Sequence, residues 1–97
     1  MPCEIRITNN AREDFLALDA RWRSAVKAAM ETHLRHEPAK MRKSRIKRLR
    51  GLRQPQYRLR VDTIRVYYDI EGDHLDVLAI VPKDRADEWL AQCGDPL

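Results

Sequence analysis

Glycine, cysteine and long apolar runs are all scarce in this chain of 97 residues. Three glycines and five prolines are too few for a collagen-like repeat or a low-complexity disordered chain. The two cysteines, Cys3 and Cys93, lie near opposite ends, which favours reduced thiols over a disulfide scaffold. The longest apolar run, residues 78–82, is far shorter than the roughly 20 residues of a membrane-spanning helix. We therefore expect one globular domain over residues 1–97, in the cytoplasm and without a membrane partner.

Metal and cofactor signatures are also missing from the sequence. No cysteine lies near another cysteine or a histidine at the spacing of metal ligands. There is no glycine-rich phosphate loop, and no Ser/His/Asp arrangement stands out. The sequence therefore predicts neither a metal site nor a cofactor.

Acidic residues are absent from one long segment. Residues 38–61 carry ten basic side chains and no acidic one, whereas the rest of the chain has a net charge of −6. Such a block of like charge repels itself unless a polyanion or an acidic partner supplies the countercharge. Eight of its cations lie before the first strongly alternating segment, and we predict that they bind RNA. These residues are Lys40, Arg42, Lys43, Arg45, Lys47, Arg48, Arg50 and Arg53.

The hydrophobic pattern predicts an α+β fold. Alternation over residues 3–8 indicates a short first strand, and apolar residues at helical spacing predict helices over 10–18 and 21–36. A basic loop then leads to a short strand at 46–50. The apolar run at 75–81 is typical of a central strand, and residues 84–92 have a helical pattern. We expect a small antiparallel sheet with an N-terminal two-helix hairpin and a short C-terminal helix.

The most informative segment is residues 56–70, where apolar and basic side chains alternate twice. Asp62 and Thr63 between the two runs suit a two-residue hairpin turn. If Val61 and Ile64 flank that turn, Arg60 faces Arg65 and Arg58 faces Tyr67, all on one side of the hairpin. Like charges placed opposite each other are destabilising, so this pattern favours a phosphate-binding face. The plainer alternative is the solvated face of a half-buried hairpin.

Several of these segments together resemble the RelE/ParE superfamily of bacterial toxin–antitoxin modules. The resemblance rests on residues 45–51 (RIKRLRG), 57–61 (YRLRV), 64–69 (IRVYYD) and a late strand ending at Lys83, and it covers about residues 4–90. It implies a microbial-ribonuclease-type fold and a toxin that cleaves mRNA in the ribosomal decoding site. It also implies a cognate antitoxin whose acidic segment wraps the toxin, against the two-helix face and the sheet edge.

The resemblance also assigns roles to residues. Arg58 and Arg60 match the first pair of basic positions, and Arg65 matches the arginine that polarises the phosphate. Lys83 or Arg85 falls where a further basic residue follows the last strand. The final helix has Trp89 where a tyrosine often assists, so Tyr67, Lys83 and Asp69 are the candidates for proton transfer. The implied catalytic residues are Arg58, Arg60, Arg65, Lys83, Arg85 and Tyr67.

Three functions remain open on the sequence. The first is a ribosome-dependent mRNA endonuclease, with the ribosome and mRNA as partners. The second is a ParE-type inhibitor that binds DNA gyrase without doing chemistry. The third is a degenerate, non-toxic member that only binds RNA. Arrest of growth, cleavage of mRNA and inhibition of supercoiling separate the three.

Overall fold

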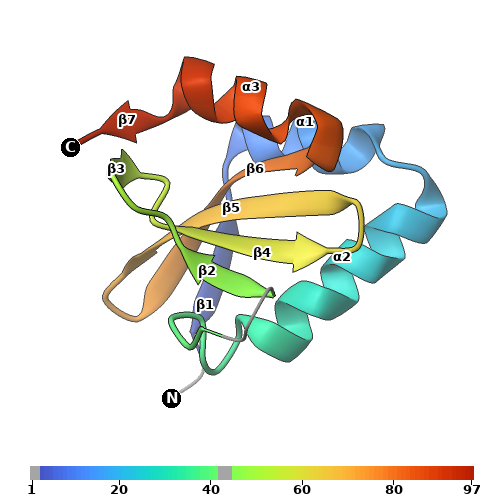
Figure 1. Ribbon diagram of the computed structural model, residues 1–97. Coiled ribbons are helices and arrows are strands. Elements are labelled where there is room, and N and C mark those ends of the chain that lie inside the picture. The colour runs from blue at the N-terminus through green and yellow to red at the C-terminus, as the bar shows by residue number, and fades with distance from the viewer. Residues whose placement is uncertain (1–2, 42–44) are drawn as a thin grey trace.

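The computed structural model describes residues 3–41 and 45–97. Within them the chain forms an α+β fold with three helices and a mixed five-stranded sheet (Figure 1). The elements in chain order are β1 (Glu4–Ile7), α1 (Asn9–Ala17), α2 (Ala20–His33), β2 (Ile46–Arg48), β3 (Leu52–Gln54), β4 (Tyr57–Val61), β5 (Ile64–Glu71), β6 (His74–Pro82), α3 (Lys83–Cys93) and β7 (Asp95–Pro96).

The sheet is mixed, so the prediction of an antiparallel sheet is wrong in one respect. Its strand order is β1-β6-β5-β4-β2, and β1 pairs with β6 in parallel, with Ile5 opposite Leu75. The other three pairings of this sheet are antiparallel. An alternating pattern marks a strand but carries no information about the direction of its neighbour. The interior position predicted for residues 75–81 is confirmed, because β6 lies between β1 and β5.

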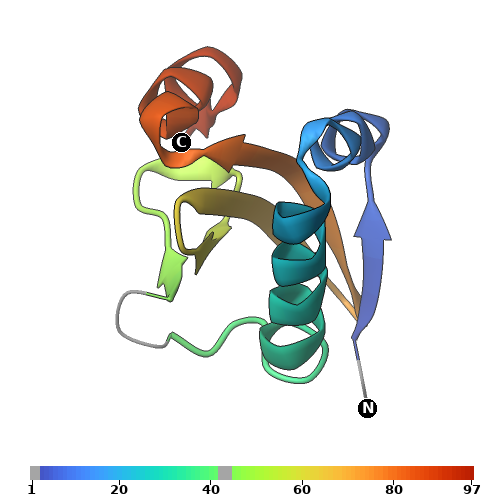
Figure 2. The same ribbon diagram turned by 90° about the vertical axis from the view of Figure 1, so that its right-hand side faces the viewer.

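The first two helices cover one face of the sheet. Thr8 caps α1 by accepting a hydrogen bond from the backbone N–H of Ala11, and Asp19 caps α2 in the same way. Helix α1 packs on β6, whereas α2 lies against β4. The helices therefore diverge over different strands (Figure 2), and they do not form the predicted hairpin of two helices packed on each other. Their apolar sides meet buried residues of the sheet, including Leu59, Val66 and Tyr68.

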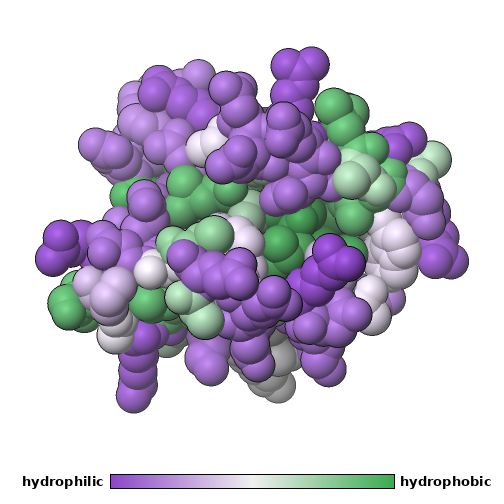
Figure 3. Space-filling view, turned by 90° about the horizontal axis from the view of Figure 1, so that it is seen from above, coloured by the Kyte–Doolittle hydropathy of each residue, from purple (hydrophilic) through white to green (hydrophobic). Residues whose placement is uncertain are grey.

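Helix α3 lies on the opposite face and builds a second, smaller core (Figure 2). Ala86, Trp89 and Leu90 of α3 pack against Tyr67, Ala79 and Val81. The chain then pairs β7 with β3 in a separate two-stranded sheet, which ties the C-terminal segment to residues 52–54. Viewed from the α3 side, the surface is largely hydrophilic with smaller apolar patches (Figure 3). No helix in the described part of the chain is long and apolar enough to cross a membrane.

Candidate functional site

The β4–β5 hairpin adopts the register that the sequence predicts. Val61 pairs with Ile64, Arg60 with Arg65, and Arg58 with Tyr67. Because directly opposed residues project from the same face, these basic side chains share one side of the hairpin. We call Arg58, Arg60 and Arg65 the arginine face. The apolar partners project the other way, and Leu59, Val61, Ile64 and Val66 are buried in the core under α1 and α2.

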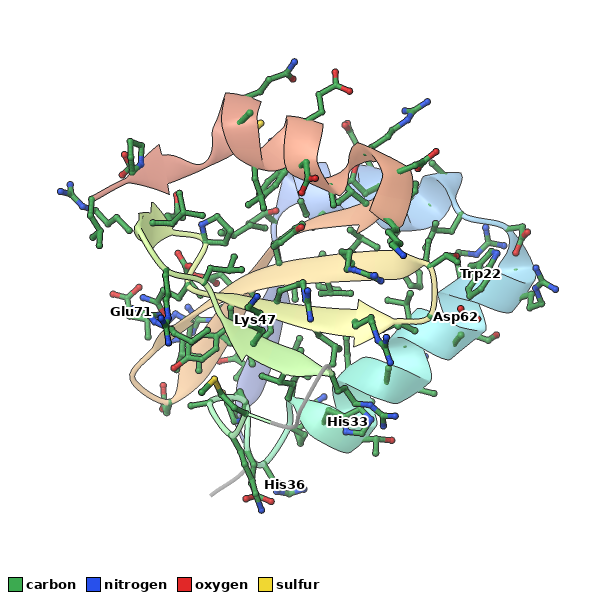
Figure 4. All side chains as sticks on the ribbon, viewed as in Figure 1. Trp22, His33, His36, Lys47, Asp62 and Glu71 are labelled. Carbon is green, nitrogen blue, oxygen red and sulfur yellow. The ribbon has the colours of Figure 1, made fainter. Side chains whose placement is uncertain are left out.

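One cation of the preceding segment extends the arginine face. Lys47 of β2 lies directly opposite Arg58, on the side away from Tyr67, and Figure 4 shows it on the β2 strand beside β4. The backbone N–H of Arg60 donates to the carbonyl of Arg45 at 2.7 Å, which brings residue 45 beside the second row. Lys47, Arg58 and Tyr67 thus form one cross-strand row, and Arg60 and Arg65 form the next, with the backbone of Arg45 at its edge.

Arg65 is the most deeply placed of the three arginines, with only 8% of its surface exposed. Its Nη1 donates to the carbonyls of Asp62, at 2.7 Å, and Ile64, at 3.2 Å. Both acceptors are backbone carbonyls at the hairpin turn, so these bonds fix the guanidinium without neutralising its charge. Burial lowers the pKa of Arg65 from its ordinary value, and the charges of Arg58 and Arg60 lower it further. Arg65 is therefore close enough to Arg58 and Arg60 to be repelled by both.

Tyr67 lies on the same face but is covered. Its ring stacks on Trp89 of α3, with centroids 4.9 Å apart and planes 12° from parallel, and only 1% of the residue is exposed. Burial raises the pKa of the Tyr67 phenol, although the nearby charges of Arg58 and Arg65 oppose the rise. The phenol is thus neutral near pH 7 and lies beneath a helix. The sequence did not foresee this cover, since nothing in the periodicity of residues 84–92 says which face they pack on.

Asp69, a third candidate for proton transfer, forms hydrogen bonds that hold a loop in place. It is two residues beyond Tyr67 on the same side of β5, and both of its carboxylate oxygens are occupied. Oδ1 accepts from the backbone N–H of Gln56 at 2.7 Å, and Oδ2 accepts from Nε2 of Gln54 at 2.6 Å. Gln56 in turn accepts from the backbone N–H of Ile70 at 2.9 Å. Asp69 therefore secures the β3–β4 connection to β5.

Lys83 and Arg85 lie on different sides of the exposed surface of α3. The backbone N–H of Lys83 donates to the carbonyl of Thr63 at 2.7 Å, which ties the start of α3 to the hairpin turn. With Thr63, Lys83 borders a shallow hollow of about 600 Å³ that also includes Asp84 and Asp87. Arg85 borders a separate hollow beside Glu88 and Trp89. Lys83 thus adjoins the hairpin turn, whereas the hollow that Arg85 borders includes Val81, which lies directly opposite Arg65.

The predicted RNA-binding cations are spread over several surfaces. Arg42 and Lys43 lie outside the described residues. Lys40 pairs with Glu37 at 3.5 Å, and Arg45 lies 2.8 Å from the His33 ring. Arg48 projects from the opposite side of β2 to Lys47, and its guanidinium lies 5.1 Å from the centre of the Tyr57 ring. Of the predicted set, Lys47 thus lies closest to the arginine face.

Arg53 is exposed on β3. Arg50 lines a groove that the sequence did not predict. The groove has a volume of about 730 Å³ and runs between the β2–β3 segment and α3. Its floor is apolar and its rim is basic. We call it the leucine groove; it is lined by Met41, Lys47, Arg48, Leu49, Arg50, Leu52 and Leu90. Leucines three residues apart at 49 and 52 are its only sequence signal.

Solved structures provide the comparison with known proteins. No known family model matches the chain, and no curated protein matches it either. The toxin–antitoxin complex RelBE2 from Mycobacterium tuberculosis contains a chain with 26% identity and a TM-score of 0.69, over 84% of this chain and 92% of that one. The fold is consistent with a RelE-like toxin. A chain of the RelB–RelE antitoxin–toxin complex from Methanococcus jannaschii matches with a TM-score of 0.65 at 16% identity, over 87% of this chain and 96% of that one, which adds support for the fold alone.

Proposed function

We propose that this RelE-like chain is the toxin of a toxin–antitoxin pair and that it cleaves mRNA on the ribosome. The arginine face is the observation that carries the proposal. Three guanidiniums from two paired strands share one side of the hairpin, and Arg65 is held by backbone carbonyls. The two structural neighbours come from complexes of a toxin with its antitoxin, which supports the toxin role.

The arginine face suits the charge that builds up when RNA is cleaved by its own 2′-hydroxyl. The 2′-oxygen forms a bond to the adjacent phosphorus, the bond from phosphorus to the 5′-oxygen breaks, and negative charge grows on the non-bridging oxygens. Guanidinium groups donate two parallel hydrogen bonds to such oxygens and remain charged at every physiological pH. Loss of one such donor typically slows a reaction by about 10²- to 10³-fold.

Proton transfer is the step for which the arginine face is least suited. An arginine is a poor base, because its pKa exceeds about 12. Tyr67 is the closest phenol, but it is buried against Trp89 and its pKa is raised. This burial favours a second candidate, a toxin that binds DNA gyrase and does no chemistry. The exposed ammonium of Lys83, next to the hairpin turn, is the remaining candidate from the sequence.

A basic surface around the arginine face would hold the RNA substrate. Lys47 continues the cross-strand row of Arg58 and Tyr67, and contacts between this surface and phosphates would make binding weaken as salt rises. These contacts carry no sequence information of their own, so they would position the strand and leave codon choice to the ribosome.

The leucine groove suits the antitoxin. Its leucine floor and its basic rim of Lys47, Arg48 and Arg50 match an amphipathic segment with apolar anchors between acidic residues. Because Lys47 belongs to both the groove and the arginine row, a segment bound there would reach the substrate face. Co-purification with a small acidic protein encoded beside this chain tests the pairing, and Leu49→Asp is expected to abolish it while Arg12→Ala is not.

Expression in a bacterial host tests the enzymatic proposal. The unaltered chain should arrest growth and leave mapped cuts in mRNA on ribosomes, and Arg60→Ala should remove both effects. Arg12→Ala, an exposed arginine on α1, is the matched control and should stay toxic. Growth arrest with intact mRNA would overturn the nuclease proposal, and inhibition of supercoiling by the purified chain would then identify the gyrase inhibitor.

A further inference from the structure

The outer side of the sheet has opposite charge at its two ends. On β5 the residues that share the face with Arg65 are Tyr67, Asp69 and Glu71, because side chains alternate along a strand. Glu71 lies six positions after Arg65 in the strand, which corresponds to about 20 Å of extended chain. Figure 4 shows Asp62 at one end of this hairpin and Glu71 at the other. The acidic end is therefore remote from the arginine face.

Three side chains with metal-binding atoms meet at that acidic end. Glu71 lies opposite His74 across the β5–β6 turn, and Asp76 follows two residues later on the same side of β6. One potential ligand atom from each lies within 4.8 Å of the others. Ligands placed about 2.1 Å from a tetrahedral ion are about 3.4 Å apart. Small rotations of these side chains would therefore suffice to surround an ion.

The orientation of His74 is a second, independent feature of this end. Its Nε2 lies 3.8 Å from Asp76 Oδ2, and its Nδ1 lies 3.8 Å from Asp73 Oδ1. Both distances are too long for a hydrogen bond. One ring nitrogen thus faces the cluster while the other faces the exposed carboxylate of Asp73, which a small shift would bring to the hydrogen-bonding distance that orients a metal-bound histidine. Only 17% of the His74 side chain is exposed, so the ring is held in place.

Arg6 lies directly opposite Asp76 on β1, but the carboxylates of Glu4, Glu71, Asp73 and Asp76 outnumber this cation, so the charge around the cluster stays negative in sum. Glu4, opposite His74 on β1, is paired with Arg6 at 3.1 Å, and Asp69 is occupied by the two glutamines. Within the described residues the carboxylate of Glu71 has neither a hydrogen bond nor an ion pair. We propose that Glu71, His74 and Asp76 bind a divalent transition metal of the zinc class, with water at the open position and Asp73 supporting His74.

This inference departs from the prediction of no metal site, which considered only the spacing of cysteine and histidine. It is also independent of the proposed function. An ion about 20 Å from Arg65 could not contact the scissile phosphate, so its role would be to stabilise the β5–β6 turn. Zinc and a zinc-selective chelator, added with Mg²⁺ held constant for the ribosome, are accordingly expected to leave cleavage of mRNA unchanged.

Titration of the full chain with zinc chloride, under reducing conditions and against a chromophoric chelator, tests the site. We expect one ion per chain, and binding weakened roughly 10- to 100-fold by His74→Ala, Glu71→Gln or Asp73→Asn. Zinc should raise the melting temperature of the unaltered chain but not that of the Glu71→Gln variant, whose exposed side chain carries no part of the fold.

Two controls address the other zinc-binding groups. His36→Ala removes an exposed imidazole elsewhere, and Cys93→Ser removes the exposed thiol. Both variants should bind zinc as the unaltered chain does. The proposal is overturned if zinc does not bind below about 1 mM, a concentration that corresponds to only about 4 kcal/mol. It is also overturned if Cys93→Ser loses binding, or if His74→Ala and Glu71→Gln retain it.

Discussion

Arg60 and Arg65 face each other on paired strands, so the arginine face should destabilise the free protein. The Cβ atoms of directly opposed residues lie about 5 Å apart, and like charges at such positions destabilise the fold by about 0.2–1 kcal/mol. Two unit charges 6 Å apart in water repel by about 0.7 kcal/mol. We therefore expect Arg60→Gln to raise the free energy of unfolding by about 0.5–1 kcal/mol at low salt. For a domain of this size that is a rise of about 2–8 °C in melting temperature.

Salt separates this repulsion from other effects of the substitution. Denaturant unfolding would be measured at 0.01 M and at 1 M ionic strength, between which the screening length falls from about 30 Å to about 3 Å. The gain in stability should be present at low salt and lost at high salt. Arg12→Gln, an exposed arginine on α1, should show neither the gain nor its loss.

The same substitution should lower activity while it raises stability. If Arg60 stabilises the charged transition state, Arg60→Gln should slow cleavage by about 10²-fold or more. A variant that is less stable at both salt concentrations, or one that is more stable and cleaves at the unaltered rate, would refute the reasoning. The first result would mean that the two guanidiniums do not repel, and the second that Arg60 does not contact the phosphate.

Three further predictions concern the parts that hold the site. Trp89→Ala should destabilise the fold by about 2–4 kcal/mol in urea unfolding, because it removes the half-buried ring stacked on Tyr67. Trp89→Phe should keep most of that stability, and equal losses in the two variants would argue against the stack. Asp62 has a φ of 55°, so Asp62→Val should cost about 1–2 kcal/mol and Asp62→Gly little, and a tolerated valine would contradict this. Burial raises the pKa of Tyr68, so its phenol keeps its proton in the folded state at a pH where the unfolded chain loses it. The free energy of unfolding should therefore fall as pH rises above about 10, and it should fall less steeply in Tyr68→Phe. Parallel pH curves for the two proteins would show that Tyr68 contributes nothing to the decline.

Much of the hairpin that carries the site could be predicted from the sequence. Residues 57–61 and 64–70 alternate strictly, and a two-residue turn leaves one register that buries all the apolar side chains together. The pairs Arg60–Arg65 and Arg58–Tyr67 followed from that local constraint and are confirmed. The roles of these residues in catalysis stay predictions.

Contacts between distant parts of the chain lie outside what such a pattern determines. The parallel pairing of β1 with β6, the packing of α1 on β6 and of α2 on β4, and the leucine groove all join segments far apart in sequence. The basic segment illustrates the difference: its charge was evident, but Lys47 and Arg48 project from opposite sides of β2, so only one of them adjoins the arginine face.

The sequence by itself determined which side chains share a face, because a strand alternates with a period of two and a short turn fixes its register. Only the tertiary structure decided what covers that face. Helix α3 packs on Tyr67 through Trp89 because the amphipathic side of a helix must be buried against some partner. Helical periodicity specifies that such a side exists, whereas the partner is selected by the whole sheet.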